Sequence, residues 1–163
     1  MRCRLVGSEM CIRDRTNPWM QESSNKIIQD GEIVSFDTDM VGPYGYCADI
    51  SRAFVCGNKF NEHQKKIYST AVEQIDYNSR LIKDGVSFRE FTEKAWILPE
   101  KYYGNRYSVM LHGIGLCDEW PAIRYPTDGG ERSGIFQKNM TITLESYIGE
   151  VGGHEGVLSL IHI

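Results

Sequence analysis

Several acidic and imidazole side chains stand where they could bind a metal ion together. They close or lie within apolar, strand-like stretches or precede a Gly-x-Gly turn, and they are Asp37, Asp39, Asp49, His112 and Glu145. Carboxylates gathered in one place repel one another at neutral pH unless a cation offsets their charge. Oxygen ligands with one imidazole suit iron, manganese or cobalt, and also zinc, rather than a thiolate site. The sequence therefore predicts a divalent metal centre.

Each of these residues also has a simpler interpretation when it is taken alone. An aspartate at the end of a strand is usually a turn or cap residue, and a lone histidine such as His112 is more often structural. Glu145 is harder to explain in this way, because a carboxylate inside the apolar run MTITLESYI would be buried, and buried carboxylates are rare without a partner. The metal interpretation rests on all of these residues together.

A predicted β-hairpin positions the aspartates. Residues 32–38 and 46–55 read as two strands, joined by the turn residues 41–45. Asp37 and Asp39 are two apart on one strand and therefore point to the same face. Asp49 comes from the antiparallel partner strand and can face them across the hairpin.

Two helices and further strands follow. Asn61 and Gln64 form a capping box that opens a helix to about Lys83, and Ser87 with Glu90 predicts a second helix to about Lys101, which Pro99 could end early. Residues 107–111 and 140–148 are predicted strands, and 121–134 an irregular loop. This order predicts an α+β fold with helices packed on one face of an antiparallel sheet.

The two ends do not continue the pattern of their neighbours. Residues 1–15 (MRCRLVGSEMCIRDR) and 158–163 (LSLIHI) resemble translated sequencing-adapter DNA at the edges of an assembled fragment. We expect both ends to be artefactual scars, and residues 16–157 to be part of a catalytic domain from a longer protein. The alternative is that the ends are an ordinary helix and strand.

Composition excludes some classes of protein. The 163-residue chain has a formal net charge of −4 and 41% hydrophobic residues, so it lacks the basic character of a nucleic-acid-binding domain. No apolar run approaches the ~18 residues of a membrane span. Five cysteines without a CxxC spacing indicate free thiols in a reducing compartment, and we expect a cytoplasmic protein without nucleic-acid or membrane partners.

Three segments resemble the M24 creatinase and aminopeptidase family, whose fold is called pita-bread. They are FDTDMVGPYGYCADISRAF, HGIGL and TITLES, and the resemblance runs from Thr16 to about Val157. It implies an incomplete C-terminal catalytic domain of that fold, with Asp39, Asp49, His112 and Glu145 as metal ligands. The family has a second glutamate ligand shortly after the first. Leu160 stands about where that glutamate belongs, and Glu150 and Glu155 are candidates only if the spacing is unusual.

Departures from the family's proline peptidases point to one branch. Asp118 replaces a histidine in a shortened segment after HGIGL, Ser146 follows Glu145 in place of Pro-Gly, and Asp37 is an additional acidic residue. These features resemble the metal-dependent dimethylsulfoniopropionate (DMSP) lyase branch, the DddP type. That resemblance implies Asp118 as general base and Tyr107 as a residue that positions or polarises the substrate.

The resemblance implies β-elimination of DMSP to acrylate and dimethyl sulfide, with iron as the expected metal (manganese, cobalt or zinc being alternatives) and a homodimer for the full-length protein. Trp120 and Tyr125 either offer aromatic faces to the sulfonium or pack in the core. Two alternatives stay open: a Xaa-Pro aminopeptidase or dipeptidase, and a non-catalytic pita-bread binding domain. Because one ligand is missing, we predict that the chain as written binds metal weakly and is inactive.

Overall fold

The computed structural model describes residues 8–13, 27–117, 119–129 and 133–163. Its elements, in chain order, are β1 (Ser8–Arg13), β2 (Ile33–Val41), a 3₁₀ turn η1 (Pro43–Gly45), β3 (Cys47–Val55), α1 (Glu62–Ser79), α2 (Phe88–Lys94), α3 (Glu100–Tyr103), β4 (Val109–Gly113), β5 (Ala122–Arg124), β6 (Ile142–Gly149) and β7 (Gly156–His162). None of the helices in these ranges is long and apolar enough to cross a bilayer.

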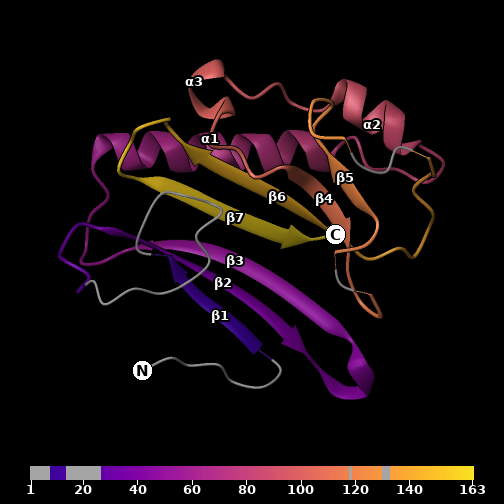
Figure 1. Cartoon of the computed structure of the whole chain (residues 1–163), viewed down its shortest axis with the longest axis horizontal. Helices are drawn as coiled ribbons and strands as arrows, with labels where there is room; N and C mark the ends of the chain where they lie inside the picture. Colours follow the sequence, from indigo (N-terminus) through magenta and orange to yellow (C-terminus); the bar gives the residue numbers. More distant parts are fainter. Residues whose placement is uncertain (1–7, 14–26, 118, 130–132) are drawn as a thin grey trace.

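The strands form two antiparallel sheets. One has the order β1-β2-β3 and the other the order β5-β4-β6-β7. Figure 1 shows α1 along one side of β6 and β7, with β3 and β2 on the other side. The predicted α+β class with a helix packed on an antiparallel sheet is confirmed, and the second sheet lies between that helix and the hairpin.

Alternating side chains explain the layers. On β6, Leu144 and Ile148 face the helices and join a core with Ile67 and Ala71 of α1 and Phe91 of α2. Ser146 shares this face, since its hydroxyl donates to the Gln74 side chain of α1 at 2.6 Å. Successive residues of a strand point to opposite faces, so the residues that alternate with Leu144, Ser146 and Ile148 face the β1-β2-β3 sheet. The region between the two sheets is therefore where Glu145 lies.

The predicted β-hairpin is confirmed, and so is the start of the first helix, which ends at Ser79 rather than near Lys83. β2 and β3 pair with Asp39 opposite Asp49 and Asp37 opposite Ser51. The capping box at the start of α1 is present in both directions, because the Asn61 side chain accepts from the Gln64 amide and the Gln64 side chain accepts from the Asn61 amide. These features depend on residues close in sequence, which explains why the pattern could predict them.

The second predicted helix is too long. α2 begins after its Ser87 cap as expected but ends at Lys94, and Ala95 is extended (φ −56°, ψ 151°). The Trp96 amide donates to the Asn78 side chain of the preceding helix at 2.9 Å, so a tertiary contact takes the place of a helical hydrogen bond. Pro99, which cannot donate one, then stands before the short α3.

Three strands were not predicted within the described residues. β5 lies inside the expected loop 121–134, and β1 and β7 include residues from the two ends that the sequence pattern set apart. β7 pairs along β6 from Gly156 to His162, so the expected boundary at Leu158 falls within a strand. The artefactual origin of both ends stays a prediction, which the reading frame in the source DNA would test.

Candidate metal centre

Three predicted ligands meet between the two sheets. Asp49 comes from β3, His112 from β4 and Glu145 from β6, and their ligand atoms all lie within 4.8 Å of one another. His112 Nε2 is 3.3 Å from Asp49 Oδ2 and 3.1 Å from Glu145 Oε1. All three side chains are buried. Residues separated by almost a hundred positions in the chain are thus brought to one point.

The arrangement of the His112 ring leaves one nitrogen for a cation. Nδ1 lies 2.9 Å from the Gly113 carbonyl oxygen, and a carbonyl only accepts, so Nδ1 carries the proton. Nε2 lies buried beside the Asp49 and Glu145 carboxylates at ion-pair distance but makes no hydrogen bond in the described structure, and Asp49 Oδ1 has no hydrogen-bond partner there either. Leaving such atoms unsatisfied costs about 1–3 kcal/mol each. A divalent cation coordinated by Nε2 and the two carboxylates would satisfy them, so the residues fit a metal ion.

Glycine is required beside the histidine. Gly113 lies against the backbone of the returning loop, and a Cβ atom at this position would overlap the Trp120 carbonyl group. The Gly113 amide donates to the Pro121 carbonyl at 3.0 Å. The close approach of these backbones holds the end of β4, and with it the orientation of the imidazole, in place.

Burial and charge shift the ionisation of the cluster in opposite ways. Burial alone would lower the pKa of His112, but the Asp49 and Glu145 carboxylates outweigh it and raise that pKa to about 11. Burial raises the pKa of Glu145 to about 7, partly offset by His112, with the negative charges of Asp49 and Asp37 adding to the rise. In the absence of a cation, a proton on His112 therefore holds the carboxylates together.

Metal binding should consequently release protons. At pH 8 the cation displaces the His112 proton, so about one proton should be released; at pH 6 Glu145 is protonated as well and release should approach about two. Apparent affinity should therefore fall more steeply with acidity below about pH 7 than above it. Calorimetry with Mn²⁺ in buffers of different ionisation enthalpy measures this number. Release near zero at both pH values would contradict it.

Asp37 and Asp39 are near the cluster but not part of it. In the β2–β3 pairing, Asp37 lies opposite Ser51 and Asp39 lies opposite Asp49, so these side chains share one face of the hairpin. The Ser51 hydroxyl donates to Asp37 Oδ1, and the charge of Asp37 reaches Glu145. Their assignment as ligands stays a prediction. Mutual repulsion is the physical reason for carboxylates to lie apart when no cation gathers them.

The two alternative glutamates are engaged elsewhere. Glu150 forms an ion pair with Lys101 at 2.6 Å, and Glu155 bonds the Gln64 side chain. Leu160 instead lies directly opposite Glu145 in the β6–β7 pairing and is buried. The interpretation that a leucine occupies the second glutamate's position therefore agrees with the register, and neither Glu150 nor Glu155 is brought to the site.

Of the two predicted catalytic residues, Asp118 and Tyr107, only Tyr107 lies within the described part of the chain. Asp118 lies outside the described residues, between the exposed Cys117 and Glu119 at the end of the segment that follows His112. Tyr107 is half-buried just before β4. Tyr125 is a packing residue, because it is buried and accepts a hydrogen bond from Gln74 at 2.7 Å.

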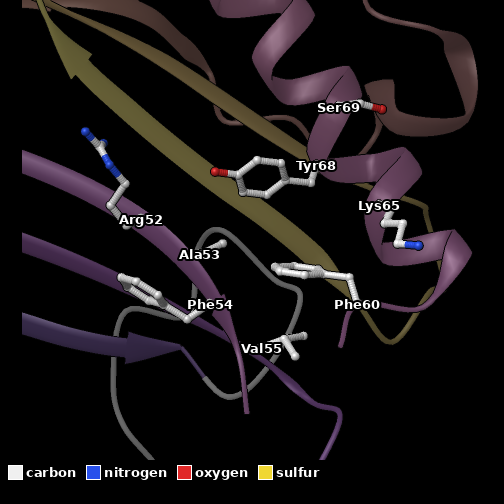
Figure 2. A pocket seen from close by; sticks show the side chains of 8 residues that line it. All are labelled: Arg52, Ala53, Phe54, Val55, Phe60, Lys65, Tyr68 and Ser69. Atoms are coloured by element: carbon white, nitrogen blue, oxygen red, sulfur yellow. The ribbon is translucent and has the colours of Figure 1, made fainter. Parts of the chain in front are cut away.

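A pocket of about 540 Å³ lies apart from these residues. Figure 2 shows Phe54 of β3 on one side and, on the other, Phe60, which precedes α1, and Tyr68 of α1. None of the candidate ligands lines it. The pocket therefore adds nothing to the metal chemistry.

Comparison with known proteins agrees with this geometry. Residues 7–159 match the model of metallopeptidase family M24. The chain is 40% identical over 144 residues to the dimethylsulfoniopropionate lyase DddP of Roseovarius nubinhibens, covering 86% of this chain and 32% of that protein. The lyase of the same name from Roseobacter denitrificans is 39% identical over 143 residues, covering 85% and 32%.

The fold agrees as well. The prolidase from Pyrococcus furiosus superposes with a TM-score of 0.75 at 25% identity, over 96% of this chain and 45% of that one. The chain spans about a third of the length of the two lyases. The expected pita-bread fold is confirmed, and the chain belongs to metallopeptidase family M24.

Proposed function

We propose that the chain is the metal-binding part of a carbon–sulfur lyase that cleaves DMSP to acrylate and dimethyl sulfide. The observation that carries this proposal is the buried meeting of Asp49, His112 and Glu145 in a chain 40% identical, over most of its length, to a protein named as a DMSP lyase. The departures after HGIGL support a lyase over a peptidase, because Asp118 replaces a histidine of the peptidases.

The elimination needs a base and a departing group. Asp118 would remove a proton from the carbon next to the substrate carboxylate, and the electron pair of that C–H bond would form the double bond of acrylate. The bond between the neighbouring carbon and sulfur breaks, and its electrons leave with dimethyl sulfide. Tyr107 would hold the substrate so that the proton faces the base.

Asp49, His112 and Glu145 would hold the cation, with Asp37 and Asp39 as further proposed ligands. When bound, the cation would stabilise negative charge developing on the substrate carboxylate. We propose iron for this position, with manganese, cobalt and zinc as alternatives. For the full-length protein we propose a cytoplasmic homodimer whose partner is the small-molecule substrate, without nucleic acid or membrane. The free thiol of Cys56 agrees with a reducing compartment.

A proline peptidase is the second candidate function, favoured by the structural similarity to the prolidase of Pyrococcus furiosus. The two activities are separated by assaying the protein encoded by the full reading frame, loaded with Fe²⁺ or Mn²⁺. A lyase should form acrylate and dimethyl sulfide from DMSP and leave a Gly-Pro dipeptide intact. Hydrolysis of the dipeptide without acrylate formation would replace the proposal by the peptidase, and metal binding without either reaction would favour a binding domain.

The chain as written should bind metal weakly and be inactive, because Leu160 supplies no ligand. Acrylate formation by the unaltered 163-residue chain would contradict this expectation. Replacing residues 158–163 by the natural continuation from the source DNA should raise its metal affinity. Calorimetric titration of Mn²⁺ into both chains measures the difference.

A further inference from the structure

A threonine lies in the same row as the metal-binding histidine. Thr143 of β6 is the direct partner of His112 of β4 in the antiparallel pairing, and directly opposed residues place their side chains on the same face of a sheet. Glu145 is two positions further along β6 and shares that face. The Thr143 side chain therefore points into the region between the sheets, beside the candidate metal ligands.

The hydroxyl of Thr143 is buried without a hydrogen bond. The residue is 0% exposed, and its Oγ1 has no partner among the described residues. The other buried threonine among the described residues, Thr92, differs, since its hydroxyl donates to the Phe88 carbonyl at 2.8 Å. Two of the other unpartnered buried atoms, Asp49 Oδ1 and His112 Nε2, belong to the metal cluster. Unsatisfied polar groups thus concentrate around one point.

These atoms can be satisfied together by a cation and its own ligands. Asp49 Oδ1 and His112 Nε2 are acceptors that can bind the cation directly. A neutral hydroxyl in the next position is better suited to donate to an oxygen bound to that cation, as second-layer groups around metal sites commonly do. A valine would fill the same space without the cost of burying the hydroxyl.

We propose that Thr143 is a positioning residue of the metal centre, and that its hydroxyl donates a hydrogen bond to an oxygen ligand of the cation that does not come from the chain. That oxygen belongs to water or to a carboxylate-bearing small molecule. The inference rests on the metal centre of the proposed function and adds to it a residue that selects and orients the exchangeable ligand.

The test compares Thr143→Val, which keeps the shape and removes the hydroxyl, with Thr143→Ser, which keeps the hydroxyl. Co²⁺ is titrated into each protein by calorimetry, and its visible absorption is recorded. The valine variant should bind Co²⁺ about tenfold more weakly and show a shifted spectrum, while the serine variant should stay close to the parent. Titrations with and without acetate identify the source of the oxygen: a deficit independent of acetate indicates water, and one that needs acetate indicates a carboxylate.

Thermal unfolding of the metal-free proteins separates this role from a structural one. Because the hydroxyl has no partner in the fold, the valine variant should melt at the same temperature as the parent or higher. A lower melting temperature with unchanged Co²⁺ affinity and spectrum would overturn the proposal, as would full agreement of the valine variant with the parent in every measurement. All variants are made in the protein encoded by the full reading frame; if that protein itself fails to bind Co²⁺, the proposed metal centre fails too, which distinguishes the two failures.

Discussion

Replacing Leu160 by glutamate should tighten binding of Mn²⁺ or Co²⁺ by about 100-fold. Leu160 is the direct partner of Glu145 across β6 and β7 and is 1% exposed, so a carboxylate there would enter the region that holds Asp49 and His112. Structural sites with four protein ligands bind Zn²⁺ with ~10–16 kcal/mol, or very roughly 3 kcal/mol per ligand. That amount corresponds to about a factor of 100 in affinity.

Stability should change in opposite directions with and without the cation. In the metal-free protein an additional buried carboxylate repels those already present, so Leu160→Glu should lower the melting temperature. Saturating Mn²⁺ should restore it, because a cation that binds only the folded state stabilises the protein by mass action. Calorimetric titration and thermal unfolding of the same samples measure both effects.

Leu160→Gln is the matched control, since it has the size of glutamate without the charge. It should lower stability without the large gain in affinity. Equal affinities of the glutamate and glutamine variants would show that position 160 does not face the metal ligands, and the register-based assignment of the missing ligand would then be wrong.

Asp118→Asn should lower the rate of acrylate formation by about 10²–10⁴-fold in the protein encoded by the full reading frame, which is the contribution typical of a general base. The amide has nearly the shape of the carboxylate but cannot accept the substrate proton. Metal affinity should stay within about twofold of the parent, because Asp118 is not a proposed ligand. Steady-state rates by chromatographic detection of acrylate, with calorimetry for the metal, measure the two quantities.

Glu119→Gln is the neighbouring control. Glu119 is exposed and adjacent to Asp118, so a general effect of removing negative charge from this segment would lower both rates equally. A large loss confined to Asp118→Asn supports its role as base. Loss of metal binding in Asp118→Asn would instead assign that residue to the coordination of the cation.

Features that depend on near neighbours could be predicted from the sequence. Asn61 and Gln64 are three residues apart, and their reciprocal capping follows from helix geometry alone. The alternation along β2 and β3, with a short turn between them, determined that Asp39 and Asp49 share a face. The types of the predicted site residues, four carboxylates and an imidazole, also predicted metal chemistry, because that chemistry depends on the type of ligand.

Features that depend on distant segments were decided by the tertiary structure. The break after Lys94 follows from the bond between Trp96 and Asn78, and β5 exists because it pairs with β4; neither partner is visible in a local window.

The pairing of β4 with β6, and of β6 with β7, sets His112 beside Thr143 and Leu160 opposite Glu145. No local pattern specifies such a register, since it is set by burying each strand against its neighbours. The residues able to bind a metal are thus a property of the sequence, whereas their meeting at one buried point is a property of the packed sheets.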